Sequence, residues 1–417
     1  MTFVKSNVPL SKPVASNETT LLVNGQGTLL FTATGAAEAT IVFSPDSEDS
    51  PDSPDSPERS TIKITLTNGK VQVWRNATEY IDSKNNSGLV NSQGAYYWVS
   101  LDSQNQTIRV GTGEARVETI IWQFTFLFTE DADRKVNKLF MESLTTVTAS
   151  VKPIKLLRDP VTSKLPALIK PTEDLSMDAV AQGKYLPKAN LPQKAQQLYD
   201  CIAGKLFTLD TPDFPDFSKA IEYSIKTPGL WCHERLKEKS TEFDKDKPNY
   251  LETYLRITLG QNNGESPGIP YVMEIWPPSH YSPIHNHGGA DAIIRVLHGS
   301  INVSLFPYLS TDSQVKPFAT LDFNKDDITW ISPTLNQVHQ LLNKQQNTCI
   351  TIQCYIYDQN DNSHYDYFDY IDANNKRQQY EPDSDMDFVK FKELMRAEYA
   401  AAAAAASSCL PKLFCRK

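Results

Sequence analysis

The sequence has no cluster of basic residues along which a nucleic acid backbone could lie. Its 417 residues carry 41 lysines and arginines against 50 aspartates and glutamates, which gives a formal net charge of -9. The excess of acid is local, because the segment SPDSEDSPDSPDSPE at 44–58 contains six acids and no base. Without that segment the balance would be close to neutral. We therefore expect no nucleic acid partner.

Long apolar segments are also missing. Residues 1–20 lack the apolar core of a secretory signal peptide. The longest apolar run, TIIWQFTFLF at 119–128, is too short and too polar to cross a bilayer. The 6 cysteines show no paired framework of the kind found in disulfide-rich secreted domains. These absences predict a cytoplasmic protein without a transmembrane segment, and we expect a monomer.

What the first third of the chain does contain is the alternating pattern of β-strands. The stretch TIKITLTNGKVQVWR at 61–75 alternates apolar and polar residues around Asn68-Gly69, a pair typical of tight hairpins. The Ser-Pro-Asp run between two strand patterns is too polar to be buried. We predict a β-sandwich-like domain over 1–135, with a disordered acidic loop at 44–60.

Part of this region resembles a known module. The stretch YYWVSLDSQNQTIRVGTG at 96–113 resembles the farnesoic acid O-methyltransferase-type β domain, and the resemblance covers about 60–130. No glycine motif for nucleotide binding accompanies it. We therefore interpret this domain as a binding or packing module and not as a methyltransferase. The sequence indicates no ligand for it.

The rest of the chain divides into three parts. Residues 136–190 mix short apolar pieces with proline and lysine, which predicts a connector. Helical patterns and then strand patterns predict one domain over 191–375. The remainder, 376–417, is predicted to be a helical or disordered tail with an alanine extension. Its cysteines, Cys409 and Cys415, are either acylation sites or part of a frayed end.

The second domain contains histidines in a pattern suited to a metal. The chain has only 7 histidines, yet His285 and His287 lie two residues apart and would face the same side of a strand. An apolar strand ending in Gly299 follows, and ITWISPTLNQVHQLLN then places His339 four residues before Asn343. These two patterns match the two signatures of the cupin fold. We predict a mainly β protein whose second domain is a cupin (double-stranded β-helix) barrel with an N-terminal helical segment.

The residue types at this site restrict which metals can bind there. Three neutral imidazoles suit Fe, Zn, Cu or Ni. Most cupins add a carboxylate ligand after the H-x-H pair, but counting back from Gly299 places Ala292 at that position. The adjacent Asp291 should face the other way. We therefore predict a site of three histidines with coordination positions open to substrate.

A strand ahead of the histidines carries Tyr254 and Arg256 on one face, in YLETYLRITLG. Arginine is well suited to bind a carboxylate through two parallel hydrogen bonds. An inward arginine in a barrel is costly unless it meets an anion. This pattern predicts either an inward Arg256 that binds a substrate carboxylate or an outward Arg256 in solvent.

The order and spacing of these residues resemble the cysteine dioxygenase family over about 190–370. The residues that carry the resemblance are Tyr254 and Arg256, His285 and His287, His339, and Tyr355 and Tyr357 in QCYIY. It implies that the histidines bind Fe(II), that cysteine chelates the iron through thiolate and amine, and that Arg256 and Tyr254 contact the substrate. It also implies a catalytic tyrosine, Tyr357 in preference to Tyr355. Both atoms of O2 would pass to sulfur and give cysteine sulfinic acid.

The chain departs from the family pattern at two positions, and the second departure bears on proton handling and substrate preference. Animal members carry a cysteine, crosslinked to the tyrosine, where this chain has Ala292. They also carry a Ser-x-His-x-Tyr run where the same strand face here reads Gln353, Tyr355, Tyr357. The alternatives are a dioxygenase for another small thiol such as 3-mercaptopropionate, or a non-enzymatic cupin that only binds a ligand. Arg256 favours cysteine, because relatives acting on 3-mercaptopropionate often lack it.

Overall fold

The chain forms two compact units in a computed structural model. The first contains the residues up to Leu165 together with Phe306–Phe318, and the second contains Pro166–Leu305 and Ala319–Lys417. The structure describes residues 8–9, 11–33, 35–46, 61–76, 79–85, 88–89, 96–126, 130–152, 154–260, 271–356 and 368–408. Most of the predicted acidic loop and the end of the predicted tail, with Cys409 and Cys415, lie outside these residues.

The first unit consists of two six-stranded sheets. The order of one sheet is β1 (Ser11–Val14), β12 (Ile154–Leu157), β3 (Gln26–Thr32), β8 (Tyr96–Asp102), β9 (Thr107–Thr112) and β10 (Ile120–Thr125). The order of the other is β2 (Glu18–Thr20), β11 (Thr146–Ala149), β4 (Glu38–Ser44), β5 (Ile62–Thr67), β6 (Lys70–Arg75) and β7 (Glu79–Asn85). Both sheets contribute to one core, which includes Phe31, Val99, Phe43 and Ile64. The unit is therefore a β-sandwich, as its strand patterns predict.

The hairpin prediction is confirmed, whereas the connector differs from expectation. Thr67 pairs with Lys70, so Asn68 and Gly69 form the turn, and Gly69 adopts a φ of 72°. In the region expected to be a connector, β11 pairs with β2 and β4, and β12 pairs with β1 and β3. Each of these strands has only 4 residues, so its alternation is too short to be distinguished from a loop. A helix, α1 (Asp131–Glu142), and a 3₁₀ turn (Val117–Thr119) complete the unit.

The second unit begins with short elements that precede its barrel. These are β13 (Leu168–Lys170) and β14 (Tyr185–Pro187), 3₁₀ turns at Thr172–Asp174, Lys188–Asn190 and Lys239–Thr241, and the helices α2 (Met177–Ala181), α3 (Gln193–Ile202), α4 (Phe217–Lys226) and α5 (Trp231–Glu238). The unit ends with α6 (Phe388–Ser408), in which Phe391 and Met395 are fully buried. No helix in the described part of the chain is both long enough and apolar enough to cross a bilayer.

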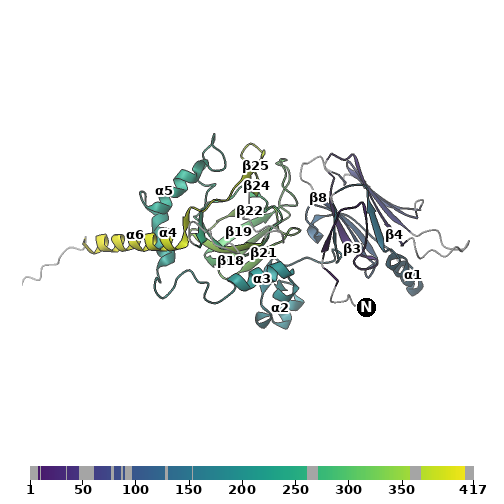
Figure 1. Cartoon of the computed structure of the whole chain (residues 1–417), viewed down its shortest axis with the longest axis horizontal. Helices are drawn as coiled ribbons and strands as arrows, with labels where there is room; N and C mark the ends of the chain where they lie inside the picture. Colours follow the sequence, from purple (N-terminus) through teal and green to yellow (C-terminus); the bar gives the residue numbers. More distant parts are fainter. Residues whose placement is uncertain are drawn as a thin grey trace, which may run out of the picture. The chain divides into compact units, whose positions relative to one another are not determined.

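The barrel consists of two six-stranded sheets that curl around one interior (Figure 1). The first has the order β21 (Ile328–Ile331), β18 (Asp291–His298), β23 (Cys349–Ile356), β16 (Tyr271–Trp276), β15 (Leu255–Leu259) and β26 (Met386–Asp387). The second has the order β20 (Ala319–Asn324), β19 (Ser300–Leu305), β22 (His339–Leu342), β17 (Ile284–His285), β24 (Phe368–Ile371) and β25 (Arg377–Tyr380). This arrangement is the double-stranded β-helix that the histidine signatures predict.

The first of these sheets is buried on both faces. Leu255 and Ile257 pack in the core formed with α3 to α6, whereas Tyr254 lines the barrel cavity. On the neighbouring strand, Met273 likewise faces the helices and Glu274 faces the cavity. Because successive side chains point to opposite faces, both strands present polar groups inward from an otherwise apolar sequence.

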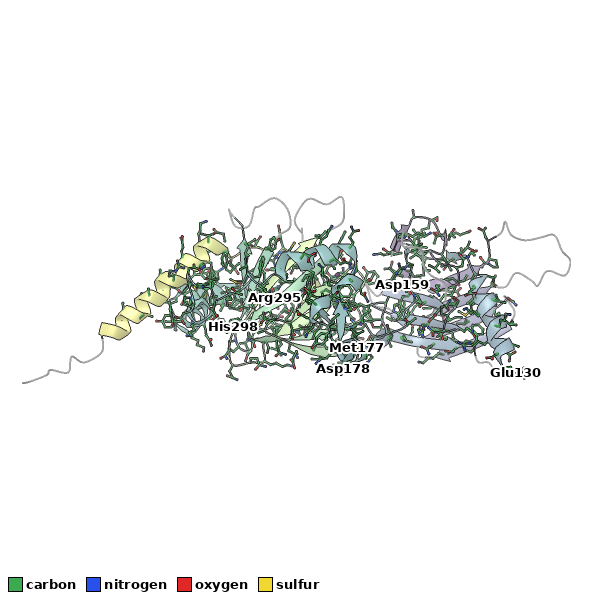
Figure 2. The ribbon with its side chains drawn as sticks, turned by 90° about the horizontal axis from the view of Figure 1, so that it is seen from below. Glu130, Asp159, Met177, Asp178, Arg295 and His298 are labelled. Atoms are coloured by element: carbon green, nitrogen blue, oxygen red, sulfur yellow. The ribbon has the colours of Figure 1, made fainter. Side chains whose placement is uncertain are left out.

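One arginine attaches helix α3 to the outer face of this sheet. Arg295 of β18, labelled in Figure 2, donates to the carbonyl oxygens of Ile202 and Gly204 at 3.1 and 3.0 Å. It also forms an ion pair with Asp326 at 2.8 Å. The last carbonyl groups of a helix lack partners within the helix, and a cation at this end also complements the helix dipole.

The turn between β18 and β19 requires a glycine. Gly299 has a φ of +71°, and a Cβ atom there would lie 2.7 Å from the carbonyl oxygen of Thr348. We expect Gly299→Ala to lower the free energy of unfolding by about 1–2 kcal/mol because of the left-handed backbone alone. The close contact with Thr348 should lower it further. Gly183→Ala is the matched control, because Gly183 has a φ of +60° with nothing within 4 Å. Equal stability losses in chemical denaturation of the two variants would contradict the predicted close contact.

Candidate metal centre

Strand pairing brings the three predicted histidines together. His285 ends β17, His287 follows two residues later, and His339 begins β22. His285 and His339 are direct partners in the antiparallel ladder between these strands. Neighbours of this kind have close side chains, so the ladder joins the two sequence signatures across a separation of more than fifty residues.

The three imidazoles are close enough to share one ion. Their possible ligand atoms all lie within 4.8 Å of one another. The ring centroids are 4.9 Å apart for His285 and His287, 4.7 Å for His285 and His339, and 4.9 Å for His287 and His339. The Nε2 atoms of His287 and His339 are 3.2 Å apart. These side chains could therefore bind a metal.

Backbone carbonyl groups set the orientation of two of the rings. Nδ1 of His285 lies 3.0 Å from the carbonyl oxygen of Pro283, and Nδ1 of His339 lies 2.9 Å from that of Asn336. A carbonyl oxygen can only accept, so the proton must be on Nδ1 in both rings. Nε2 then carries the lone pair, which is the arrangement that a metal ligand requires.

Burial keeps the three rings neutral. It lowers the pKa of His285 to about 4 and that of His339 to about 3, and it holds the pKa of His287 well below the ordinary value. The neighbouring imidazoles lower the pKa of His287 and His339 further. Neutral imidazoles without a carboxylate form a donor set that fits iron, zinc, copper or nickel.

The second residue of the later signature has a structural role. Asn343 is fully buried, and its Nδ2 donates to the carbonyl oxygens of Trp276 and Asn347 at 2.8 and 2.9 Å. These bonds fix the end of β22 against β16. Asn343 therefore holds the strand that begins with His339.

A cavity of about 70 Å³ lies beside the histidines. Its wall is largely apolar and aromatic, with Tyr254 stacked on Trp276 at 4.3 Å and Phe368 edge-on to His287 at 4.5 Å. Its polar lining residues include Glu274 and Gln353. The arrangement provides a small, mostly apolar pocket beside the three imidazoles, with a few polar groups that could orient a ligand.

Arg256 is buried, as expected for an inward residue, but its partner is an internal carboxylate. Its Nη1 lies 3.3 Å from Oε1 of Glu274, the residue directly opposite on β16. Among the described residues that line the cavity, Glu274 is present and Arg256 is not. The inward position of Arg256 therefore requires no substrate carboxylate, because Glu274 already compensates its charge.

Sequence reasoning did not identify Glu274. The signal was available, since Glu274 is the one charged residue in the strand YVMEIW and shares a face with Trp276. Its second oxygen accepts a hydrogen bond from Nε2 of Gln353, and the hydroxyl of Tyr355 donates to Oε1 of Gln353. Burial raises the pKa of Glu274, and the positive charge of Arg256 opposes that shift.

Of the two candidate tyrosines, Tyr355 lies at the site. It is buried, its ring stacks on that of His287 at 5.9 Å, and it is the direct partner of Ala292 in the ladder between β18 and β23. The ladder partner of Ala292 is therefore Tyr355, whereas the resemblance favoured Tyr357 as the tyrosine opposite this position. Alanine has no sulfur, so no thioether can form there. Tyr357 lies outside the described residues.

No known family profile matches the chain. The chain is similar to the Cupin_2 domain of an XRE-family transcriptional regulator from Enterobacter cloacae, at 11% identity over 25% of this chain and 98% of that one, with a TM-score of 0.20. A double-stranded β-helix protein from Klebsiella pneumoniae shares 14% identity over 31% of this chain and 85% of that one, with a TM-score of 0.20.

An oxalate oxidase in complex with the substrate analogue glycolate shares 18% identity over 25% of this chain and 51% of that one, with a TM-score of 0.20. Likeness at this level supports no statement about activity. The strand order and ladders of the second unit define its class directly. It is a double-stranded β-helix barrel with a cluster of three histidines that could bind a metal.

Replacing any one of the three clustered histidines should remove the metal. We expect purified protein to hold about one metal ion per chain, and His285→Ala, His287→Ala and His339→Ala each to lose most of it in elemental analysis. His298→Ala is the control, since His298 ends β18 outside the cluster and is labelled in Figure 2. Full metal content in the three variants would rule out this centre.

Proposed function

We propose that the protein is an iron-dependent thiol dioxygenase that converts L-cysteine and O2 to cysteine sulfinic acid. The observation that carries the proposal is the set of three neutral imidazoles beside a cavity and a buried tyrosine, a cluster to which the described residues add no carboxylate ligand. The resemblance of the same residues to the cysteine dioxygenase family, in order and spacing, supports it.

In this proposal His285, His287 and His339 hold Fe(II) through their Nε2 atoms. Bound iron supplies the redox chemistry between dioxygen and the thiol. Both oxygen atoms pass to sulfur, so that R–SH and O2 give R–SO2H. The sulfur is oxidised and the dioxygen is reduced, and no further reductant is consumed.

The roles proposed for the surrounding residues come from the family resemblance. By it, Tyr254, which lines the cavity, and Arg256, which lies behind Glu274, bind the polar end of the substrate. The contact with Glu274 uses one of the five N–H donors of the guanidinium. Tyr355 is proposed as the tyrosine next to the iron because its ring stacks on His287. The role proposed for Tyr357 from the family resemblance stays a prediction.

Oxygen consumption tests the proposal directly. Iron-loaded protein should consume one O2 per cysteine and form the sulfinic acid, as followed with an oxygen electrode and mass spectrometry. Protein loaded with zinc is the control, because zinc has no redox chemistry. If the iron-loaded protein consumes no oxygen with cysteine, 3-mercaptopropionate or another small thiol, the dioxygenase proposal is wrong and the ligand-binding alternative is favoured.

The proposed role of Arg256 predicts a dependence on the substrate. Loss of a charge-assisted hydrogen bond costs roughly 1.5–3 kcal/mol, so Arg256→Ala should lower kcat/KM for cysteine by about 10- to 150-fold. The loss should be much smaller with cysteamine, which has no carboxylate. Thermal unfolding must accompany the kinetics, because this variant leaves Glu274 buried without its partner. Equal losses on both substrates would mean that Arg256 only positions Glu274.

A further inference from the structure

The charged group that faces the candidate cavity is a carboxylate. Glu274 lines the cavity together with the histidines, whereas Arg256 contacts it from the adjacent strand β15. Its side chain is 7% exposed, so it is almost removed from water. A carboxylate in such a position acts strongly on any charged group that enters, because little solvent lies between them.

The neighbours of Glu274 hold its side chain in place and oppose the rise in its pKa that burial causes. Arg256 donates to Oε1 at 3.3 Å, and Gln353 donates to Oε2. Gln353 is itself held by the hydroxyl of Tyr355 and lies 3.3 Å from Oγ1 of Thr351. Each carboxylate oxygen can accept two hydrogen bonds, so the two contacts leave capacity for a donor from a ligand.

A fixed carboxylate discriminates between small thiols by their second functional group. A thiol that carries only a carboxylate adds a negative charge beside Glu274, and like charges at short range repel. A thiol that carries an amino group offers N–H donors to the same oxygens, whether the amine is an ammonium or is bound to a metal. The Arg256–Glu274 ion pair has no net charge but carries both signs, so it is complementary to a ligand that has both an amino group and a carboxylate.

We propose that Glu274 is a specificity-determining residue that binds the amino group of the substrate and so restricts the site to aminothiols. This inference rests on the proposed function for the identity of the substrate class. Glu274 excludes thiols such as 3-mercaptopropionate, which have a carboxylate and no amine.

Three variants separate this role from a structural one. Glu274→Gln keeps the shape of the side chain and removes its charge. Because this substitution leaves Arg256 without an anionic partner, the double variant Glu274→Leu with Arg256→Met removes both charges, an exchange that buried pairs often tolerate. Glu242→Gln is the matched control, since Glu242 is a largely buried carboxylate paired with Lys239, and it does not line the described cavity.

Anaerobic calorimetry of the iron-loaded protein measures the binding affinity for each thiol without turnover. The probes are L-cysteine, cysteamine and 3-mercaptopropionate. Wild type and Glu242→Gln should bind the two aminothiols about 10- to 100-fold more tightly than 3-mercaptopropionate. Glu274→Gln and the double variant should lose most of this preference, and Glu274→Gln should gain affinity for 3-mercaptopropionate.

The outcomes distinguish this inference from the proposed function. Equal affinities for the three thiols, or an unchanged preference in a folded Glu274→Gln and double variant, would overturn the role of Glu274 even if oxygen uptake occurs. Preference for aminothiols that depends on Glu274, without oxygen uptake, would support the inference and overturn the dioxygenase. Absence of binding by all three thiols would overturn both.

Discussion

The interior of the barrel can hold the charge of Arg256 because Glu274 lies opposite it on the neighbouring strand. A buried guanidinium without a partner would cost several kcal/mol, so the ladder between β15 and β16 must keep the register that pairs these residues. The same carboxylate engages Gln353, which in turn bonds to Tyr355 on β23. One ion pair therefore connects the polar groups of three adjacent strands and turns a carboxylate toward the cavity.

The two sheets of the barrel contribute different chemistry. Arg256, Glu274 and Tyr355 come from the sheet that packs against the helices, whereas His285 and His339 come from the facing sheet. A ligand in the cavity between the sheets meets imidazoles on one side and charged or hydrogen-bonding groups on the other. This division allows the metal-binding residues and the residues proposed to bind the substrate to be set by separate ladders.

Strong local patterns predicted most of the fold. The alternation at 61–75 around Asn68-Gly69 predicted a hairpin, and the two histidine signatures predicted the barrel. Prediction was weaker where the elements are short. The 4-residue strands β11 and β12 carry too few alternations for a period to appear, yet they complete both sheets of the first unit. Their positions depend on partners more than one hundred residues away.

For the candidate site, the sequence by itself determined which side chains can face inward together, because alternation in a strand fixes the face of each residue. That reasoning identified His285 and His287, and the match to the second cupin signature added His339. The same reasoning also placed Ala292 opposite a tyrosine, but the tyrosine that it favoured was Tyr357. Only the tertiary structure decided that the partner of Ala292 is Tyr355 and that the anion next to Arg256 is Glu274. Those contacts lie across strands, and the register that joins two strands is set by the packing of the whole barrel rather than by either segment alone.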